Sequence, residues 1–322
     1  MSAKRIGVVG ARGHVGRELL KLIERDATCT VAFVASKGTA GQRAGDAIGA
    51  TGRFADLILE DVLPTDLARY VDNSELDGVV LGLGNGQSQP WVDALPARIP
   101  LVDLSADHRF DDGGPFIYGL TAKHRERLVG ATRVANPGCY ATAVQLALWP
   151  FEAITSSAHV FGVSGYSGAG STPSSKNDLK ILTDNLLPYD LVGHTQEREL
   201  RRHSGVADVR FMPHVAPFFR GITVTVSLDL TTSISAADAI ALLRATYAHE
   251  ALVTVLDGQM PPLVSDVRDR SGVIIGGVEV DVERRRLVLV AVIDNLLTGA
   301  ATQALQNLHL ALGVDELSGI IR

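Results

Sequence analysis

The residues with the clearest capacity for chemistry surround Cys139, in the segment Asn136-Pro-Gly-Cys-Tyr-Ala-Thr-Ala. The apolar run that follows, through Leu146, predicts a helix that begins at the cysteine. The positive end of a helix dipole stabilises a thiolate over a thiol, and the thiolate is the nucleophilic form. A lone cysteine in an apolar neighbourhood is more often a buried structural residue, so the spacing leaves both interpretations open. Cys29, in the apolar run 27–31, is predicted to be structural.

Nine histidines compete for the role of proton carrier beside such a nucleophile. Glu197 follows His194 by three residues, which places both on one face of a helix. A carboxylate there would orient the imidazole and favour its charged form. His214 is a rival, and local spacing does not choose between the two. Nothing near His194 in the sequence completes a set of metal ligands, and we predict no metal site.

A second candidate site is the loop Gly10-Ala-Arg-Gly-His-Val-Gly16, between a predicted strand, 5–9, and a predicted helix, 15–25. Glycines there permit a tight turn and close approach of the backbone to a phosphate, which the helix N-terminus attracts. A tight turn without a ligand would use the same residues. The position between a strand and a helix at the chain start favours a dinucleotide site, formed by Gly10, Arg12, Gly13, His14, Val15 and Gly16.

The residues after the second predicted strand, 30–35, bear on which dinucleotide would bind. Ser36 and Lys37 stand where an NAD site usually places an acidic residue for the ribose hydroxyl. A hydroxyl and a cation suit a 2′-phosphate, which favours NADP(H). Lys37 would fit equally well as a solvated surface lysine.

The pattern of elements that must position these residues changes along the chain. The first part alternates short apolar strands with helices: a helix is predicted near 66–71, and further strands at 78–83, 101–104 and 132–135. This alternation predicts a parallel sheet covered on both faces, a Rossmann-type α/β domain. The later part has longer alternating strands, at 208–212, 222–230, 273–282 and 286–294, and a helix at 236–248 with Ser235 as N-cap. These predict an α+β domain with a mixed, mainly antiparallel sheet. We expect domains at 1–138 and 139–298, with a C-terminal helix, 299–322, that packs back on the first.

Composition excludes several classes of protein. The chain has 322 residues, 46% apolar and 20% charged, as in folded globular proteins. A net charge of −6 gives no general attraction to nucleic acid or anionic membranes. No apolar stretch approaches the roughly 18 residues of a membrane span, and two cysteines are too few for a disulfide scaffold or a zinc site. The first residues predict a strand and not a signal peptide, and we expect a cytoplasmic protein.

Six motifs in order make the chain similar to the N-acetyl-gamma-glutamyl-phosphate reductases, within the aspartate-semialdehyde dehydrogenase superfamily. They cover nearly the whole length: 10–16, 136–143, Ser164-Gly-Tyr-Ser-Gly-Ala-Gly170, 194–197, 212–221 and Ile293-Asp-Asn-Leu-Leu-Thr-Gly-Ala-Ala301. The chain departs from the family at Gln196, where proline is usual. It also has Ser171 where a basic residue often follows the second glycine loop, and Lys176 or Lys180 could compensate.

The resemblance implies that the second domain is the catalytic and dimerisation domain, and it implies residue roles that the spacing leaves open. Cys139 would be the nucleophile, and His194, with Glu197, the acid–base partner. The cofactor NADP(H) would also contact Gly84, Gly168 and Asn295. The substrate would contact Arg109, Asn136, His214 and Arg220, although both arginines could equally be structural ion-pair partners.

The implied activity is NADPH-dependent reduction of N-acetyl-gamma-glutamyl phosphate to the semialdehyde and phosphate through a cysteine thioester, in arginine biosynthesis, by a homo-oligomer (dimer or tetramer). A related semialdehyde dehydrogenase acting on aspartyl phosphate or a carrier-bound aminoacyl phosphate would share this chemistry. A non-catalytic NADP-sensing regulator would bind the cofactor without turnover, and an interaction module would not bind it.

Overall fold

The computed structural model describes residues 3–111, 113–258 and 260–320, which form two compact units. The N-terminal unit runs to Pro137 and resumes at Ala300, and the central unit is Gly138–Gly299. Residues 1–2 and 321–322, the ends of the predicted first domain and of its C-terminal segment, lie outside the described residues. No helix in the described part of the chain has the length and apolar character needed to cross a membrane.

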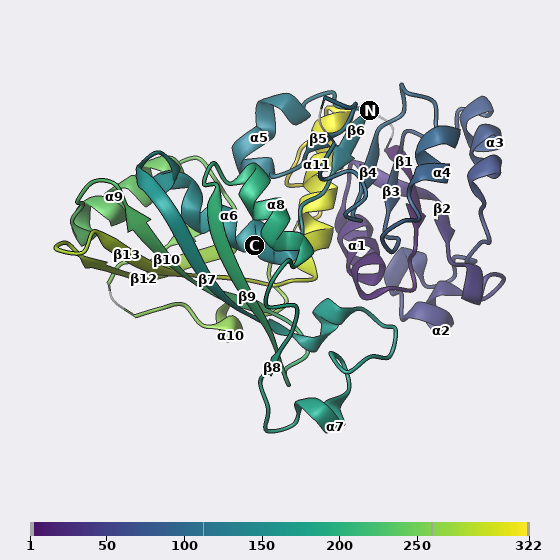
Figure 1. Cartoon of the computed structure of the whole chain (residues 1–322). Coiled ribbons are helices and arrows are strands. Elements are labelled where there is room, and N and C mark those ends of the chain that lie inside the picture. Colours follow the sequence, from purple (N-terminus) through teal and green to yellow (C-terminus); the bar gives the residue numbers. More distant parts are fainter. Residues whose placement is uncertain (1–2, 112, 259, 321–322) are drawn as a thin grey trace. The chain divides into compact units, whose positions relative to one another are not determined.

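The N-terminal unit is built on a six-stranded sheet of order β2-β1-β3-β4-β6-β5 in which every neighbouring pair is parallel (Figure 1). The strands in the centre are apolar and fully buried, because helices cover both faces of a parallel sheet. The predicted Rossmann-type sheet is therefore confirmed, with one short additional strand, β5. The bounds are β1 (Lys4–Val9), β2 (Cys29–Ala35), β3 (Gly78–Leu81), β4 (Leu101–Asp103), β5 (Ile117–Tyr118) and β6 (Arg133–Ala135).

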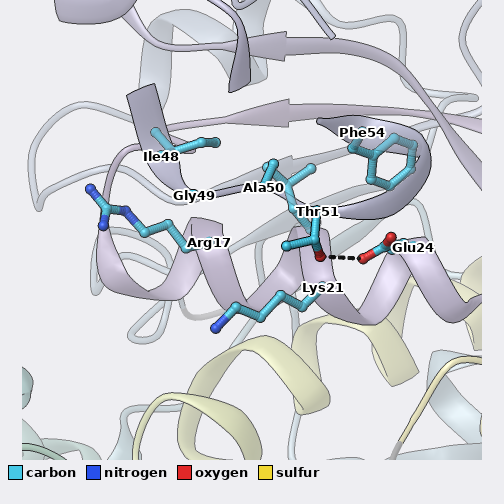
Figure 2. A pocket seen from close by; sticks show the side chains of 9 residues that line it. Arg17, Lys21, Glu24, Ile48, Gly49, Ala50, Thr51 and Phe54 are labelled. Atoms are coloured by element: carbon cyan, nitrogen blue, oxygen red, sulfur yellow. Dashed lines mark hydrogen bonds between the residues drawn. The ribbon is translucent and has the colours of Figure 1, made fainter. Parts of the chain in front are cut away.

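The helices of this unit are mostly short, and the longest is amphipathic: α1 buries Leu19, Leu20, Leu22 and Ile23. Their bounds are α1 (His14–Arg25), η1 (Lys37–Thr39), α2 (Ala44–Ile48), η2 (Gly52–Phe54), η3 (Pro64–Asp66), α3 (Leu67–Asp72), α4 (Gln89–Ala94), α5 (Thr121–Leu128) and α11 (Thr302–Leu312). The segment that contains η2 lies along α1 (Figure 2). There the Thr51 hydroxyl donates to Glu24, and the Arg53 guanidinium caps the end of α1 through the carbonyl oxygens of Ile23 and Asp26.

The C-terminal part of the chain contributes α11, which packs against β3, β4, α1 and α5. The expected helix over 299–322 is too long. A π-helical turn, η6 (Leu297–Ala301), precedes α11, and Gly313 ends the helix in the left-handed conformation at φ 67°. The following turns are held by the buried carboxylate of Asp26, which accepts from the Ser318 hydroxyl and lies 2.8 Å from His309 Nε2. Cys29 is fully buried next to this group, and burial raises the pKa of its thiol to about 12.

The central unit contains a seven-stranded sheet of order β11-β12-β13-β10-β7-β9-β8. Four of its six pairs are antiparallel, while β7–β9 and β11–β12 are parallel, which confirms the predicted mixed, mainly antiparallel sheet. The sequence did not predict β7, β8 or β11. The bounds are β7 (Thr155–Gly165), β8 (Leu187–Pro188), β9 (Asp208–Ala216), β10 (Ile222–Leu230), β11 (Val253–Val255), β12 (Val273–Asp281) and β13 (Arg286–Ile293).

Helices cover one face of this sheet: α6 packs on β10 and β13, and α8 packs on β9 (Figure 1). Ser235 caps α9 as predicted, through its hydroxyl and the N–H of Asp238. The opposite face, which we call the open face, carries half-exposed or exposed side chains because residues alternate along each strand. The helices are α6 (Cys139–Leu148), η4 (Trp149–Ile154), η5 (Tyr166–Ala169), α7 (Leu179–Leu182), α8 (Thr195–His203), α9 (Ala236–Thr246) and α10 (Val264–Val267).

Candidate active site

Cys139 is the first residue of α6, on the covered face of the central sheet. The N-cap, Gly138, is extended, and its N–H donates to the buried carboxylate of Glu199 at 2.8 Å. A Cβ on Gly299 would lie 2.6 Å from the Cβ of Cys139, so only glycine lets this segment pack behind the cysteine. The cysteine backbone is thereby fixed at a helix N-terminus, where the dipole favours a thiolate.

Cys139 lines a cavity within the central unit. Ten residues line it: Cys139, Tyr140, Ser164, Gly165, Gly168, Ala169, Lys176, Tyr189, Gln196 and Val215. Among these described residues, Lys176 is the one cation. Its Nζ lies 4.6 Å from the centre of the Tyr189 ring and 3.6 Å from the carboxylate of Asp190. The cavity therefore combines a nucleophile, hydroxyl and amide groups, and one positive charge, which suits an anionic carbonyl compound.

His194 is the N-cap of α8, and its Nδ1 accepts the main-chain N–H of Gln196 at 3.1 Å. A neutral imidazole that accepts at Nδ1 carries its proton on Nε2, so Nε2 is the donor. The ring packs edge-on against Tyr189 and Phe211, at centroid distances of 5.5 and 5.4 Å. Burial lowers the pKa of His194, and the neighbouring carboxylates only partly offset this. The neutral form is therefore the one present at neutral pH.

Glu197 does not orient His194 in the way the sequence suggested. Its carboxylate accepts the main-chain N–H of Phe211 at 2.9 Å and pairs with Arg201 at 2.9 Å, which leaves a backbone N–H as the group that holds the imidazole. The charge of Glu197 favours protonation of His194, as expected, but burial outweighs it. Glu197 braces α8 against β9.

The second glycine loop lies beside the thiol and is held by side chains from the closing motif. Gly168 lines the cavity, and a Cβ there would lie 2.8 Å from the Ser164 hydroxyl. Asn295 donates from its amide to the Ser167 hydroxyl at 3.0 Å and accepts the N–H of Gly221 at 2.7 Å. Asn295 thus holds the second glycine loop in place through Ser167, and Gly168 of this loop lines the same cavity as Cys139.

The two arginines expected to bind substrate have structural partners. The Arg220 guanidinium makes two hydrogen bonds to the buried carboxylate of Asp294, at 2.6 and 3.0 Å, and a third to Asp269 at 2.6 Å. In the N-terminal unit, Arg109 donates to the carbonyl oxygens of Asn136 and Leu104 at 2.8 and 2.7 Å. Arg220 therefore has the ion-pair partners of the structural alternative, and Arg109 braces the main chain, while the role of both in substrate binding stays a prediction.

The other two expected substrate contacts, His214 and Asn136, belong to different units. The side chain of His214 lies on the open face with Phe161, at a ring-centroid distance of 4.3 Å, because Val215 is the β9 residue that lines the cavity. Asn136 belongs to the N-terminal unit and is 1% exposed. Its amide oxygen accepts from Asn307 at 3.0 Å.

The first glycine loop has the geometry of a dinucleotide site. Gly10 has φ +84°, and a Cβ there would meet the Gly82 carbonyl oxygen at 2.2 Å, while one on Gly16 would meet Ala11 at 2.6 Å. Gly13, the N-cap of α1, has φ −63°, and its nearest neighbour would be 3.5 Å from a Cβ. None of the described residues requires glycine at position 13, whereas a pyrophosphate at the N-terminus of α1 would. The residues present therefore fit a dinucleotide.

The remaining expected cofactor residues follow the carboxyl ends of β2 and β3, the two strands that flank β1, at the edge where parallel sheets bind nucleotides. Ser36 and Lys37 follow β2, and the Arg12 guanidinium lies 2.7 Å from where a Cβ of Gly38 would stand. Gly84 follows β3, in a turn whose Gly86 N–H donates to Asp107. Two cations beside the end of β2 fit a 2′-phosphate.

Sequence reasoning missed Tyr189 and Ser164 as parts of the cavity, and it treated Gln196 only as a departure from a motif. Tyr189 follows the short strand β8 and is brought to Cys139 by the pairing of β8 with β9. Burial raises its pKa, so its hydroxyl stays protonated. Tyr189 lies in none of the six motifs, because its place depends on the pairing of β8 with β9. Ser164 and Gln196 lie within motifs, but their spacing does not show that they reach the same cavity.

Comparisons with known proteins agree with this geometry. Residues 5–131 match the model of the semialdehyde dehydrogenase NAD-binding domain, and residues 139–295 match the semialdehyde dehydrogenase dimerisation domain. Among solved structures, aspartate semialdehyde dehydrogenase II of Vibrio cholerae complexed with ASA has a TM-score of 0.76 at 19% identity, over 96% of this chain and 98% of that one. The NADP-bound enzyme of Candida albicans has a TM-score of 0.74 at 18% identity, over 97% and 99%. These neighbours show the fold.

Curated relatives are closer in sequence. N-acetyl-gamma-glutamyl-phosphate reductase of Xanthomonas campestris pv. campestris (strain B100) is 47% identical over 98% of both chains. The protein of the same name from Stenotrophomonas maltophilia (strain R551-3) is 46% identical over 98% of this chain and 97% of that protein. The mitochondrial protein arg-6 of Neurospora crassa is 43% identical over 98% of this chain, which corresponds to 36% of that longer protein.

Proposed function

The chain belongs to the N-acetyl-gamma-glutamyl-phosphate reductase family of semialdehyde dehydrogenases, and from this premise we propose that it reduces N-acetyl-gamma-glutamyl phosphate with NADPH, in arginine biosynthesis in the cytoplasm. The observation that carries the proposal is the placement of Cys139 at the start of α6, in a cavity with a single cation among its described lining residues. Relatives of the same name at 47% and 46% identity support this substrate over aspartyl phosphate.

In this mechanism the Cys139 thiolate attacks the carbonyl carbon of the acyl phosphate, and the carbon–oxygen bond to phosphate breaks to leave a thioester. When bound, NADPH supplies a hydride to the thioester carbon. The Nε2–H of His194 donates a hydrogen bond to the carbonyl oxygen as negative charge develops there, and the resulting alkoxide collapses to the aldehyde as the carbon–sulfur bond breaks and the Cys139 thiolate leaves. The neutral, Nε2-protonated imidazole described above fits this role.

The test runs the reaction backward, because its reagents are stable. Purified protein is mixed with NADP, phosphate and N-acetylglutamate semialdehyde, and NADPH absorbance is followed. We expect phosphate-dependent NADPH formation, with a lower rate when NAD replaces NADP. Activity with aspartate semialdehyde alone would reassign the substrate and keep the mechanism. Cofactor binding without turnover of any aldehyde would instead support a sensor.

Lys176 is the side chain we propose for an anionic group of the substrate. Replacement of Lys176 by Met should raise the KM for the aldehyde or for phosphate about 10- to 100-fold, since a charge-assisted hydrogen bond contributes ~1.5–3 kcal/mol. The matched control is Lys180→Met, because Lys180 lies in the same segment but is exposed and does not line the cavity. Equal KM values for both variants and the wild type would exclude Lys176 from substrate binding.

We propose that the open face of the central sheet forms a homodimer. Phe161, Thr225 and Val290 are paired across β7, β10 and β13 on this face, and Phe161 is 39% exposed. Phe161→Asp would place a charge in the interface, which is costly unless it is paired. Analytical ultracentrifugation should then show half the mass of the wild type. Val129→Asp, at a 61% exposed position of the N-terminal unit, should leave the mass unchanged. A wild-type monomer would contradict the proposal.

A further inference from the structure

Gln196, the second residue of α8, contacts both residues of the proposed reaction. Its main-chain N–H donates to His194 Nδ1 at 3.1 Å. Its side-chain Oε1 accepts the N–H of Ala141, in the first turn of α6, at 2.9 Å. Its Nε2 lies 4.0 Å from Cys139 Sγ, and the side chain lines the cavity. One residue therefore joins the start of α8 to the start of α6.

The chemistry of the Ala141 contact fixes the orientation of the Gln196 amide. A main-chain N–H can only donate, so the amide atom that faces Ala141 must be oxygen. The NH₂ group is then the end directed at the sulfur of Cys139, and an amide NH₂ can only donate. The amide is half-buried and held at its oxygen end, so the donor is already aimed before a substrate binds.

We propose that Gln196 is a hydrogen-bond donor to the Cys139 thiolate, which lowers the proton affinity of the nucleophile and holds it in place for attack. The inference rests on the proposed function only in taking the thiolate as the reacting species. A donor beside an anion stabilises the charged form, and charge-assisted hydrogen bonds are shorter and stronger than neutral ones. The 4.0 Å separation leaves room for the NH₂ to approach the sulfur when the thiol ionises.

The experiment measures the rate at which iodoacetamide alkylates Cys139 in the full-length protein, as a function of pH and without substrate. In Gln196→Met the donor is lost, and the alkylation rate at pH 7 should fall about 3- to 10-fold as the kinetic pKa rises by roughly half a unit to one unit. In Gln196→Glu a negative charge faces the sulfur, and the fall should exceed about tenfold. Cys29 is fully buried, and Cys139→Ser measures any background.

Two comparisons separate the donor role from a structural one. A wild-type alkylation rate in Gln196→Glu, which keeps an acceptor for the Ala141 N–H but replaces the donor beside the sulfur with a negative charge, would overturn the proposal. Gln145→Met removes another buried amide on α6, one that donates to the Ala141 carbonyl at 3.1 Å, and should change the rate less than about twofold. An equal effect of Gln145→Met would also overturn it.

The outcome is distinguishable from a failure of the proposed function, because alkylation requires neither cofactor nor acyl group. A shifted kinetic pKa without reductase activity would support the donor role of Gln196 and reject the substrate. Reductase activity with an unshifted kinetic pKa in both Gln196 variants would reject only the donor role.

Discussion

Replacement of Cys139 by Ser is expected to lower phosphate-dependent NADPH formation by at least about 10³-fold, because no other group can then carry the acyl chain. The serine hydroxyl has nearly the size of the thiol but is not ionised by a helix dipole at neutral pH. The fold around it should stay intact, since the neighbouring contact with Gly299 involves the Cβ atom and not the sulfur. The measurement is the backward assay with NADP, phosphate and N-acetylglutamate semialdehyde.

The matched control is Cys29→Ser, which changes the other cysteine of the chain. Cys29 lies in β2, is fully buried and has a raised thiol pKa, so it cannot serve as a nucleophile. Its replacement should affect stability by about 1–3 kcal/mol, the cost of an imperfectly satisfied buried hydroxyl, while the rate per folded molecule stays the same. A Cys139→Ser protein with wild-type activity would rule out the thioester.

The strands predicted best from the sequence are those whose own residues alternate between apolar and polar. The bounds of β10, Ile222–Leu230, agree with the prediction because apolar and polar residues alternate without interruption. The neighbouring strand β7, Thr155–Gly165, was missed although it lies inside the sheet, between β10 and β9. Its serines and glycines have low strand propensity, and its stability comes from pairing with β9 and β10, which are distant in the sequence.

The candidate site divides in the same way. The residues of the glycine loop and the segment around Cys139 follow local rules of turns and helix N-termini, so their spacing in the sequence predicts both sites. The partners of Arg220 cannot be predicted from local sequence, because Asp294 is 74 residues away. Asp294 becomes a bidentate partner only through the pairing of β10 with β13. The contact between Gln196 and Cys139 spans 57 residues and has no sequence signature.

The expected result for His194→Asn is a fall in kcat of about 10²- to 10³-fold, the contribution of a positioned hydrogen-bond donor to a developing oxyanion. Asparagine is a good N-cap, and its side-chain oxygen can accept the Gln196 N–H in place of Nδ1. The variant therefore keeps the start of α8 and removes the imidazole. His214→Asn, on the open face, should change kcat less than about threefold, and a larger loss there than at His194 would exchange the two roles.

The protonation state of His194 provides an independent check on its role. Because burial lowers its pKa, the imidazole should titrate below the value of an unperturbed histidine and be neutral at pH 7. Nitrogen-15 NMR should show the Nε2-protonated tautomer, since Nδ1 accepts the Gln196 N–H. Above this pKa the ring donates from Nε2, and below it Nδ1 must also carry a proton, which breaks the bond to Gln196. Activity should therefore decline as the pH falls through the His194 pKa, and a raised pKa would assign the orientation of the ring to Glu197 after all.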